Sequence, residues 1–230
     1  MRQIQGTLVA ASFAVMFACG NTSASENSTV ASAPVVQQQA SEPPQKPGLG
    51  DGLYATIKTA RGSIVCQLEY AATPMTVANF VALAEGKHPY VTTVDKTKPF
   101  YNGILFHRVV PNFVIQAGDP TGTGAGGPGY TFPEEIVPSL KHDKAGTLAM
   151  ARRPERGTNA SQFYITHTAT PALDGNYTVF GHVVSGQDVV NAIQQGDKIE
   201  SVTIEARGKE AKAFDAVKVL TTNKDKFKAN

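Results

Sequence analysis

The sequence contains no tryptophan and two cysteines, Cys19 and Cys66. Two thiols cannot supply a disulfide framework or a cysteine-rich metal cluster. The 21 Lys and Arg residues are nearly balanced by 19 Asp and Glu residues and form no basic run, so the charge pattern of a nucleic-acid-binding protein is missing. The apolar run from Leu8 to Ala18 is too short to cross a bilayer as a helix.

The sequence also lacks common hydrolase motifs, because it contains neither G-x-S-x-G nor H-E-x-x-H. Residues 122–127 do satisfy G-x-G-x-x-G after a predicted strand. A dinucleotide site requires a helix to begin there, whereas residues 128–133, Pro-Gly-Tyr-Thr-Phe-Pro, cannot be helical. We therefore interpret the glycines as a tight loop beside a groove, and we expect no cofactor and no metal.

The N-terminal residues read as an export signal. Residues 1–19 combine a basic start, a short apolar run and the junction Ala18-Cys19, which resembles the lipobox of bacterial lipoproteins and predicts lipidation at Cys19. The alternative is an ordinary secretory signal cleaved near Ser23-Ala24-Ser25. Residues 20–50 are rich in Ser, Gln, Ala and Pro, which predicts a disordered tether. We expect an exported, periplasmic and membrane-anchored lipoprotein that contacts the membrane only through this lipid.

The remaining residues have the pattern of one mainly β domain over 51–222, with a frayed tail at 223–230. Short strands alternate with turn-rich loops, and Cys66 lies on the apolar face of one strand as a buried structural thiol. Thr73-Pro74 predicts a helix start, with an apolar stripe through Ala84, and a second helix is expected from Ser185 to Ile193. This order favours a closed antiparallel barrel with helices at its ends.

Three sequence blocks carry the functional signal. They are Phe106-His107-Arg108-Val109-Val110-Pro111-Asn112-Phe113-Val114-Ile115-Gln116-Ala117-Gly118-Asp119, then Met150-Ala151 with Gly157-Thr158-Asn159-Ala160-Ser161-Gln162-Phe163-Tyr164-Ile165, then Leu173-Asp174-Gly175 with Val179-Phe180-Gly181. Together they resemble the cyclophilins, the prolyl cis/trans isomerases. The resemblance runs from about Leu53 to the C-terminal region and implies an eight-stranded closed barrel capped by two α-helices.

The resemblance also implies roles for individual residues. The implied catalytic residues are Arg108, Phe113 and Gln116; the implied substrate-binding residues are Val114, Ala151, Gln162, Tyr164, Leu173 and Tyr177. Rotation about an X-Pro bond breaks no covalent bond, so a fixed donor such as the Arg108 guanidinium suffices to stabilise the twisted amide. We expect a monomer that acts on proline-containing polypeptides in the cell envelope. The alternative is a proline-peptide binding or chaperone module without essential turnover.

Several positions depart from the family pattern. Tyr164 replaces the usual Phe of the pocket, Ala172 stands at a rim position often filled by Trp, and Tyr177 stands at a rim His position. These changes predict ordinary isomerase activity but weak binding of cyclosporin-type ligands. Arg152, Arg153 and Arg156 form a basic loop that we interpret as solvated, with a role in choosing the residues that flank the proline as the alternative.

Overall fold

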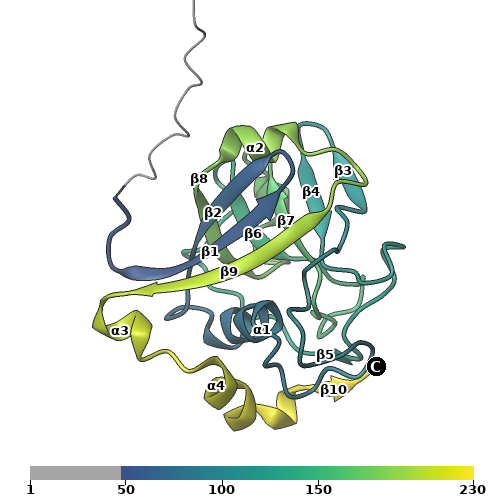
Figure 1. The fold of residues 1–230 in the computed structure, drawn as a ribbon, viewed down its shortest axis with the longest axis vertical. Helices are drawn as coiled ribbons and strands as arrows, with labels where there is room; N and C mark the ends of the chain where they lie inside the picture. Colours follow the sequence, from purple (N-terminus) through teal and green to yellow (C-terminus); the bar gives the residue numbers. More distant parts are fainter. Residues whose placement is uncertain (1–47) are drawn as a thin grey trace, which may run out of the picture. The chain divides into compact units, whose positions relative to one another are not determined.

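The computed structural model describes residues 48–230, and its main feature is one curled antiparallel sheet (Figure 1). The eight strands lie in the order β3-β4-β7-β6-β8-β2-β1-β9. Their bounds are β1 Gly52–Thr59, β2 Gly62–Leu68, β3 Arg108–Val110, β4 Val114–Ala117, β6 Thr147–Met150, β7 Phe163–Thr166, β8 Val179–Ser185 and β9 Ile199–Arg207. The fold is therefore mainly β, as the alternation of short strands and turns predicted.

The barrel is not closed, so that part of the predicted fold is wrong. In the described part of the chain the edge strands β3 and β9 do not pair with each other. The irregular segments that precede them do meet: Leu105 and Lys198 form an isolated bridge, and the backbone N–H of Phe106 donates to the Asp197 carbonyl at 2.8 Å. The sheet thus curls without a continuous ladder, because the segment before β3 is not in strand conformation.

The interior of the sheet holds the core. Ile57, Ile64 and Cys66 are fully buried on strands β1 and β2, which pair in antiparallel register. The prediction that Cys66 is buried is confirmed, and burial raises the pKa of its thiol to about 12, which disfavours the reactive thiolate. Phe80, Phe163 and Phe180 join the same core with tilted and edge-on ring contacts.

Helices α1 (Pro74–Ala84) and α2 (Gln187–Ala192) lie at opposite ends of the curled sheet (Figure 1). Thr73 is the N-cap of α1 as predicted, but its side chain does not cap the helix; instead the Glu135 carboxylate accepts from the backbone N–H groups of Met75 (3.1 Å) and Thr76 (2.6 Å). The sequence predicted that only one face of α1 is buried, but every residue from Met75 to Ala84 is buried. The reason is that a C-terminal helix, α4 (Ala216–Thr222), packs against α1.

The C-terminal residues are ordered, so the predicted fraying of 223–230 is wrong. After α3 (Gly208–Lys212), α4 and the 3₁₀ turn η2 (Lys224–Lys226), strand β10 (Lys228–Ala229) pairs with β5 (Tyr130–Thr131). Phe227 anchors this segment in an aromatic cluster, where its ring centroid lies 5.2 Å from Tyr90 and 5.4 Å from Phe132. Figure 1 shows β10 beside β5 at the end of the molecule that carries α4.

The predicted signal peptide, the lipidation site Cys19 and most of the predicted tether lie outside the described residues. Among residues 48–230, no helix has the length and apolar character needed to span a bilayer.

Candidate active site

A shallow pocket of about 160 Å³, with both apolar and polar walls, lies where strands β4 and β7 meet the loop after β6 and the 3₁₀ turn η1 (Pro171–Leu173). Its walls contain eight of the nine predicted site residues. The lining residues are Arg108, Phe113, Val114, Gln116, Ala151, Arg152, Tyr164, Leu173 and Tyr177. The ninth, Gln162, lies next to the pocket and binds Gln116. The structure therefore brings the whole predicted set together.

The β3–β4 hairpin positions the polar side of this pocket. Arg108 and Gln116 are direct cross-strand partners, and the turn between the strands is tight because Asn112 adopts a left-handed backbone conformation with φ of 60°. The guanidinium of Arg108 donates from Nη1 to Gln116 Oε1 at 3.3 Å and lies 5.9 Å from the centre of the Phe113 ring. The Arg108 guanidinium is exposed, and these contacts hold it at the entrance to the pocket.

Gln116 is held in turn by a chain of hydrogen bonds. Its Nε2 donates to Gln162 Oε1 at 2.9 Å, and Gln162 Nε2 donates to the carbonyls of Gly124 and Gly126 at 3.0 Å each. Each amide thus has one defined orientation, because its oxygen and its nitrogen both have fixed partners. The glycine-rich loop, residues 122–127, therefore anchors the side chain that holds Arg108.

The glycine-rich loop is organised around Asp119, which is 1% exposed. The Asp119 carboxylate accepts from the backbone N–H groups of Thr121 (2.7 Å), Gly124 (2.6 Å) and Gly126 (3.1 Å). Burial opposes ionisation of this group, but the hydrogen bonds from Thr121, Gly126 and Gly124 outweigh it and lower the pKa of Asp119 below its ordinary value of 3.8. The amides of the G-x-G-x-x-G stretch thus bind a side chain of the protein itself, and the loop lies beside the groove as interpreted.

Tyr164, one of the residues that line the pocket, begins a polar chain that the sequence did not reveal. The Tyr164 hydroxyl lies 2.8 Å from His142 Nε2, and His142 Nδ1 lies 2.9 Å from Asp174 Oδ1. Because the Asp174 carboxylate accepts, Nδ1 of His142 carries a proton and donates it to this hydrogen bond. The hydroxyl that distinguishes Tyr164 from Phe therefore has a buried partner. The segment Lys141-His142-Asp143 carried no periodic signal, so these contacts depend on tertiary packing.

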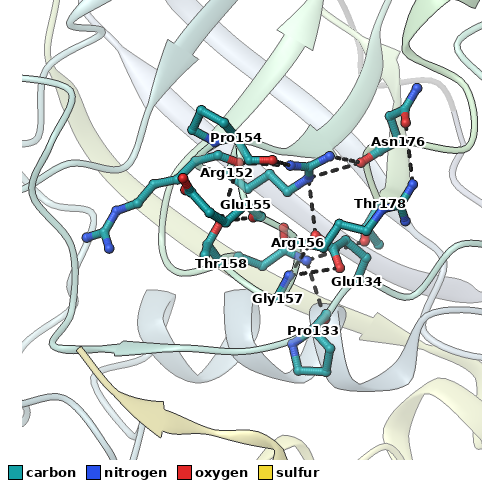
Figure 2. A network of polar contacts seen from close by, with 12 residues as sticks. Pro133, Glu134, Arg152, Pro154, Glu155, Arg156, Gly157, Thr158, Asn176 and Thr178 are labelled. Carbon is teal, nitrogen blue, oxygen red and sulfur yellow. Dashed lines mark hydrogen bonds and ion pairs between the residues drawn. The ribbon is translucent and has the colours of Figure 1, made fainter.

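Arg152 is not solvated, so the interpretation of the basic loop is wrong for this residue. Its Nε lies 3.1 Å from Glu134 Oε1, and both side chains are 7% exposed. Its guanidinium also donates to the Asn176 carbonyl at 3.0 Å and lies 4.9 Å from the centre of the Tyr177 ring. Figure 2 shows Arg152 between Glu134 and Asn176.

The same network fixes the rim of the pocket. The Glu134 carboxylate also accepts from the Gly157 N–H at 3.0 Å, and Arg152 Nη1 donates to the Pro154 carbonyl at 2.8 Å (Figure 2). These contacts tie the loop 152–158 to the segment that carries Tyr177. Arg152 and Glu134 both make further hydrogen bonds, and these offset the free-energy cost of removing the two charges from water.

The arrangement is suited to binding a small apolar ring beside a fixed cation and two fixed amides. Val114, Tyr164 and Leu173 offer the apolar surface, while Arg108 and Gln116 offer donors at the pocket mouth. Such a site can act on a substrate without a covalent step, because it supplies hydrogen bonds and charge where the geometry of the substrate changes.

Comparisons with known proteins agree with this geometry. The family model described as cyclophilin type peptidyl-prolyl cis-trans isomerase/CLD matches residues 54–220. Peptidyl-prolyl cis-trans isomerase A of Mycobacterium tuberculosis is 49% identical over 146 residues, which cover 61% of this chain and 80% of the relative. Peptidyl-prolyl cis-trans isomerase B of Streptomyces anulatus is 43% identical over 176 residues, covering 69% of this chain and 100% of the relative.

Solved structures give the same result. A Cryptosporidium parvum cyclophilin type peptidyl-prolyl cis-trans isomerase superposes with a TM-score of 0.58 at 30% identity, covering 67% of this chain and 98% of that one. The structure obtained in the presence of the dipeptide Ala-Pro gives a TM-score of 0.54 at 30% identity and covers 68% of this chain and 99% of that one.

Proposed function

The chain belongs to the cyclophilin-type peptidyl-prolyl cis-trans isomerase family and is an isomerase, and on this basis we propose that Arg108 is the group that stabilises the twisted X-Pro amide. The proline ring of a polypeptide substrate occupies the apolar slot of Val114, Tyr164 and Leu173. The carbonyl that precedes the proline accepts from Gln116. The solved relative crystallised with Ala-Pro supports a proline-containing ligand for this fold.

The physical argument rests on what changes during rotation. Amide resonance sets a barrier of about 18–20 kcal/mol, and the nitrogen recovers its lone pair only when the bond is twisted. A donor that meets this lone pair binds the twisted amide better than either planar isomer, which lowers the barrier. The observation that carries the proposal is the Arg108 guanidinium, which Gln116 Oε1 holds at 3.3 Å at the mouth of the slot.

The test compares turnover with binding. In a proline-isomerisation assay on a short Xaa-Pro peptide, Arg108→Ala should lower kcat/KM by at least about a hundredfold, the loss typical of one preorganised stabilising donor. Its circular dichroism should match the wild type, because the Arg108 side chain is exposed. Arg156→Ala, which removes another exposed guanidinium outside the pocket, is the matched control. Full activity in a folded Arg108→Ala protein would favour the binding-module alternative.

We further propose that the substrates are folding proteins of the cell envelope. This rests on the signal-like residues 1–19 and the lipobox-like junction at Cys19. In cell fractionation, Cys19→Ser should move the protein from the detergent-extracted membrane fraction to the soluble fraction, whereas Cys66→Ala should leave its location unchanged. A wild-type protein that is already soluble and begins near Ser25 would contradict lipidation.

A further inference from the structure

The C-terminal segment, residues 207–230, packs against the domain on one side. On α4, Ala216 and Leu220 are buried on one face of the helix, while Lys218 is exposed on the opposite face, because two residues turn a helix by about 200°. Helix α4 packs against α1. Figure 1 shows α3, α4 and β10 following one another along the end of the molecule that lies away from α2. The packing of this segment therefore fixes which of its side chains face solvent.

The last residues of the segment follow the same rule. Phe227 is half-buried and packs in the aromatic cluster, whereas its neighbours Lys226 and Lys228 are exposed. Pairing of β10 with β5 holds this part of the chain in place. It lies beyond the family match, which ends at residue 220, so these exposed lysines lie outside the matched part of the fold.

The segment is basic, whereas the rest of the domain is not. Residues 207–230 contain seven Lys and Arg against three Asp and Glu, while residues 48–206 contain 12 against 14. The acidic groups of the segment are Glu210, Asp215 and Asp225. The excess charge stays positive when the terminal carboxylate of Asn230 is counted with them.

The charge is carried by lysines that no carboxylate neutralises. The six exposed lysines, which we call the lysine surface, are Lys209, Lys212, Lys218, Lys224, Lys226 and Lys228. Within residues 48–230 none of them forms an ion pair, whereas the one arginine of the segment, Arg207, pairs with Glu205 at 2.8 Å. An ammonium group is a compact point charge that needs no matched planar partner, so such a set suits a surface of many phosphates.

The described chain also begins at this end of the domain. The Leu49 carbonyl accepts from Arg207 Nη1 at 2.8 Å, directly before α3. The chain therefore enters the domain beside the lysines of α3. A lipid on Cys19 would join the protein to the membrane from the side of the domain that carries the lysine surface.

We propose that the lysine surface of α3, α4 and β10 binds an anionic phospholipid membrane, so that the domain itself contacts the headgroups. This differs from the expectation that a lipid is the only membrane contact. The inference goes beyond the proposed function and is independent of isomerisation and of lipidation, because it needs only the exposed lysines. Clusters of roughly four to eight Lys or Arg bind anionic lipids, and each residue at the surface strengthens binding by about fivefold.

The test measures binding to lipid vesicles by co-sedimentation. All proteins are the full chain with Cys19→Ser, which excludes lipidation. The vesicles contain phosphatidylglycerol and phosphatidylcholine in equal parts, or phosphatidylcholine alone. The readout is the ratio of the two partition coefficients, because any binding through the apolar run Leu8–Ala18 is the same in every variant. The ratio should be at least about a hundredfold at low salt, as three lysines at the surface would give, and should approach unity in about 0.5 M salt, which screens exposed charges.

A triple variant locates the contact. Lys224→Gln, Lys226→Gln and Lys228→Gln together should lower the ratio by about a hundredfold, because three contributions of about fivefold are lost. Circular dichroism and isomerase activity should match the wild type, since none of these lysines lines the proline slot.

A control variant of the same net charge separates location from total charge. Lys96→Gln, Lys141→Gln and Lys198→Gln together remove three exposed lysines outside the C-terminal segment. Because these positions do not belong to the lysine surface, the ratio should fall by less than about threefold.

Three results would overturn the inference. They are equal binding of the wild type to both kinds of vesicle, an equal loss in the two triple variants, and release of the protein from anionic vesicles by a short DNA duplex at equal phosphate concentration. The last result would assign the lysines to nucleic acid. Isomerase activity is measured on the same preparations, so absent turnover with intact vesicle binding would contradict the proposed function alone.

Discussion

Replacing Asp119 with Asn tests whether the hydrogen-bond chain behind Arg108 matters for turnover. Asp119 lies on no wall of the proline slot, and it reaches Arg108 only through the glycine-rich loop, Gln162 and Gln116. In the wild type, Asp119 Oδ2 accepts from Gly124 N–H at 2.6 Å and from Gly126 N–H at 3.1 Å. An Asn side chain that keeps its oxygen toward Thr121 turns an NH₂ group toward these two donors.

The expected size of the effect follows from these two lost bonds. A buried N–H without a partner costs about 1–3 kcal/mol, and entry of water reduces that cost at a loop, so we expect a loss of about 2–4 kcal/mol in the free energy of unfolding. For a domain of this size that corresponds to a Tm lower by roughly 5–15 °C. Because the carbonyls of Gly124 and Gly126 are the acceptors for Gln162, kcat/KM should fall about tenfold, equivalent to ~1.4 kcal/mol.

Differential scanning calorimetry gives the stability, and a proline-isomerisation assay well below the lowered Tm gives kcat/KM. The matched control is Asp215→Ala, which removes the N-cap acceptor of α4 for Lys218 N–H (2.9 Å), far along the chain from the groove. It should cost about 1 kcal/mol of stability and leave kcat/KM unchanged. If Asp119→Asn loses stability but keeps wild-type kcat/KM, the chain through Gln162 does not position Arg108 and the reasoning is wrong.

The ionised Asp119 also predicts a pH dependence. Folding lowers the pKa of this carboxyl below its ordinary value of 3.8, so the unfolded chain takes up the proton first as the pH falls. The stability that Asp119 contributes is therefore fully present above that ordinary value. It should be lost as the pH falls through the folded pKa, and Asp119→Asn should remove this part of the acid dependence.

Three other predictions concern the pocket and the core. Tyr164→Phe leaves His142 Nε2 buried without its partner, so it should cost about 1–3 kcal/mol in urea unfolding while kcat/KM changes less than about threefold; a tenfold loss would show that the hydroxyl acts in turnover. Burial lowers the pKa of His88 from its ordinary 6.5 to about 3, so between these values the unfolded chain binds a proton that the folded chain does not. The free energy of unfolding should therefore fall by about 1.4 kcal/mol for each unit by which the pH is lowered from 6.5 towards 3. A His88→Gln variant with the same pH slope would contradict this. Ala172 is exposed on η1, so Ala172→Trp should tighten cyclosporin inhibition by up to about thirtyfold, equivalent to ~2 kcal/mol, and tight inhibition of the wild type would refute the assignment of this rim position.

The three residues that the resemblance implies as catalytic lie close together in the sequence. Arg108, Phe113 and Gln116 lie within one hairpin, and a hairpin with a tight turn places cross-strand partners beside each other whatever surrounds it. The burial of Cys66 and the start of α1 at Thr73-Pro74 are local in the same sense, because strand alternation and the fixed φ of proline encode them directly. For these features the sequence determined the outcome.

Tertiary structure decided the features that join distant segments. Tyr164 contacts His142, and Arg152 pairs with Glu134. The C-terminal segment lies near the groove because Phe227 packs in an aromatic cluster. The edges of the sheet also remained open although the number of strands suited a closed barrel. No periodicity encodes such contacts, because they form between loops and chain ends whose positions are fixed only when the core packs. The sequence by itself therefore determined the family and the local hairpin that brings Arg108, Phe113 and Gln116 together, and packing determined how those residues are held and which side chains border them.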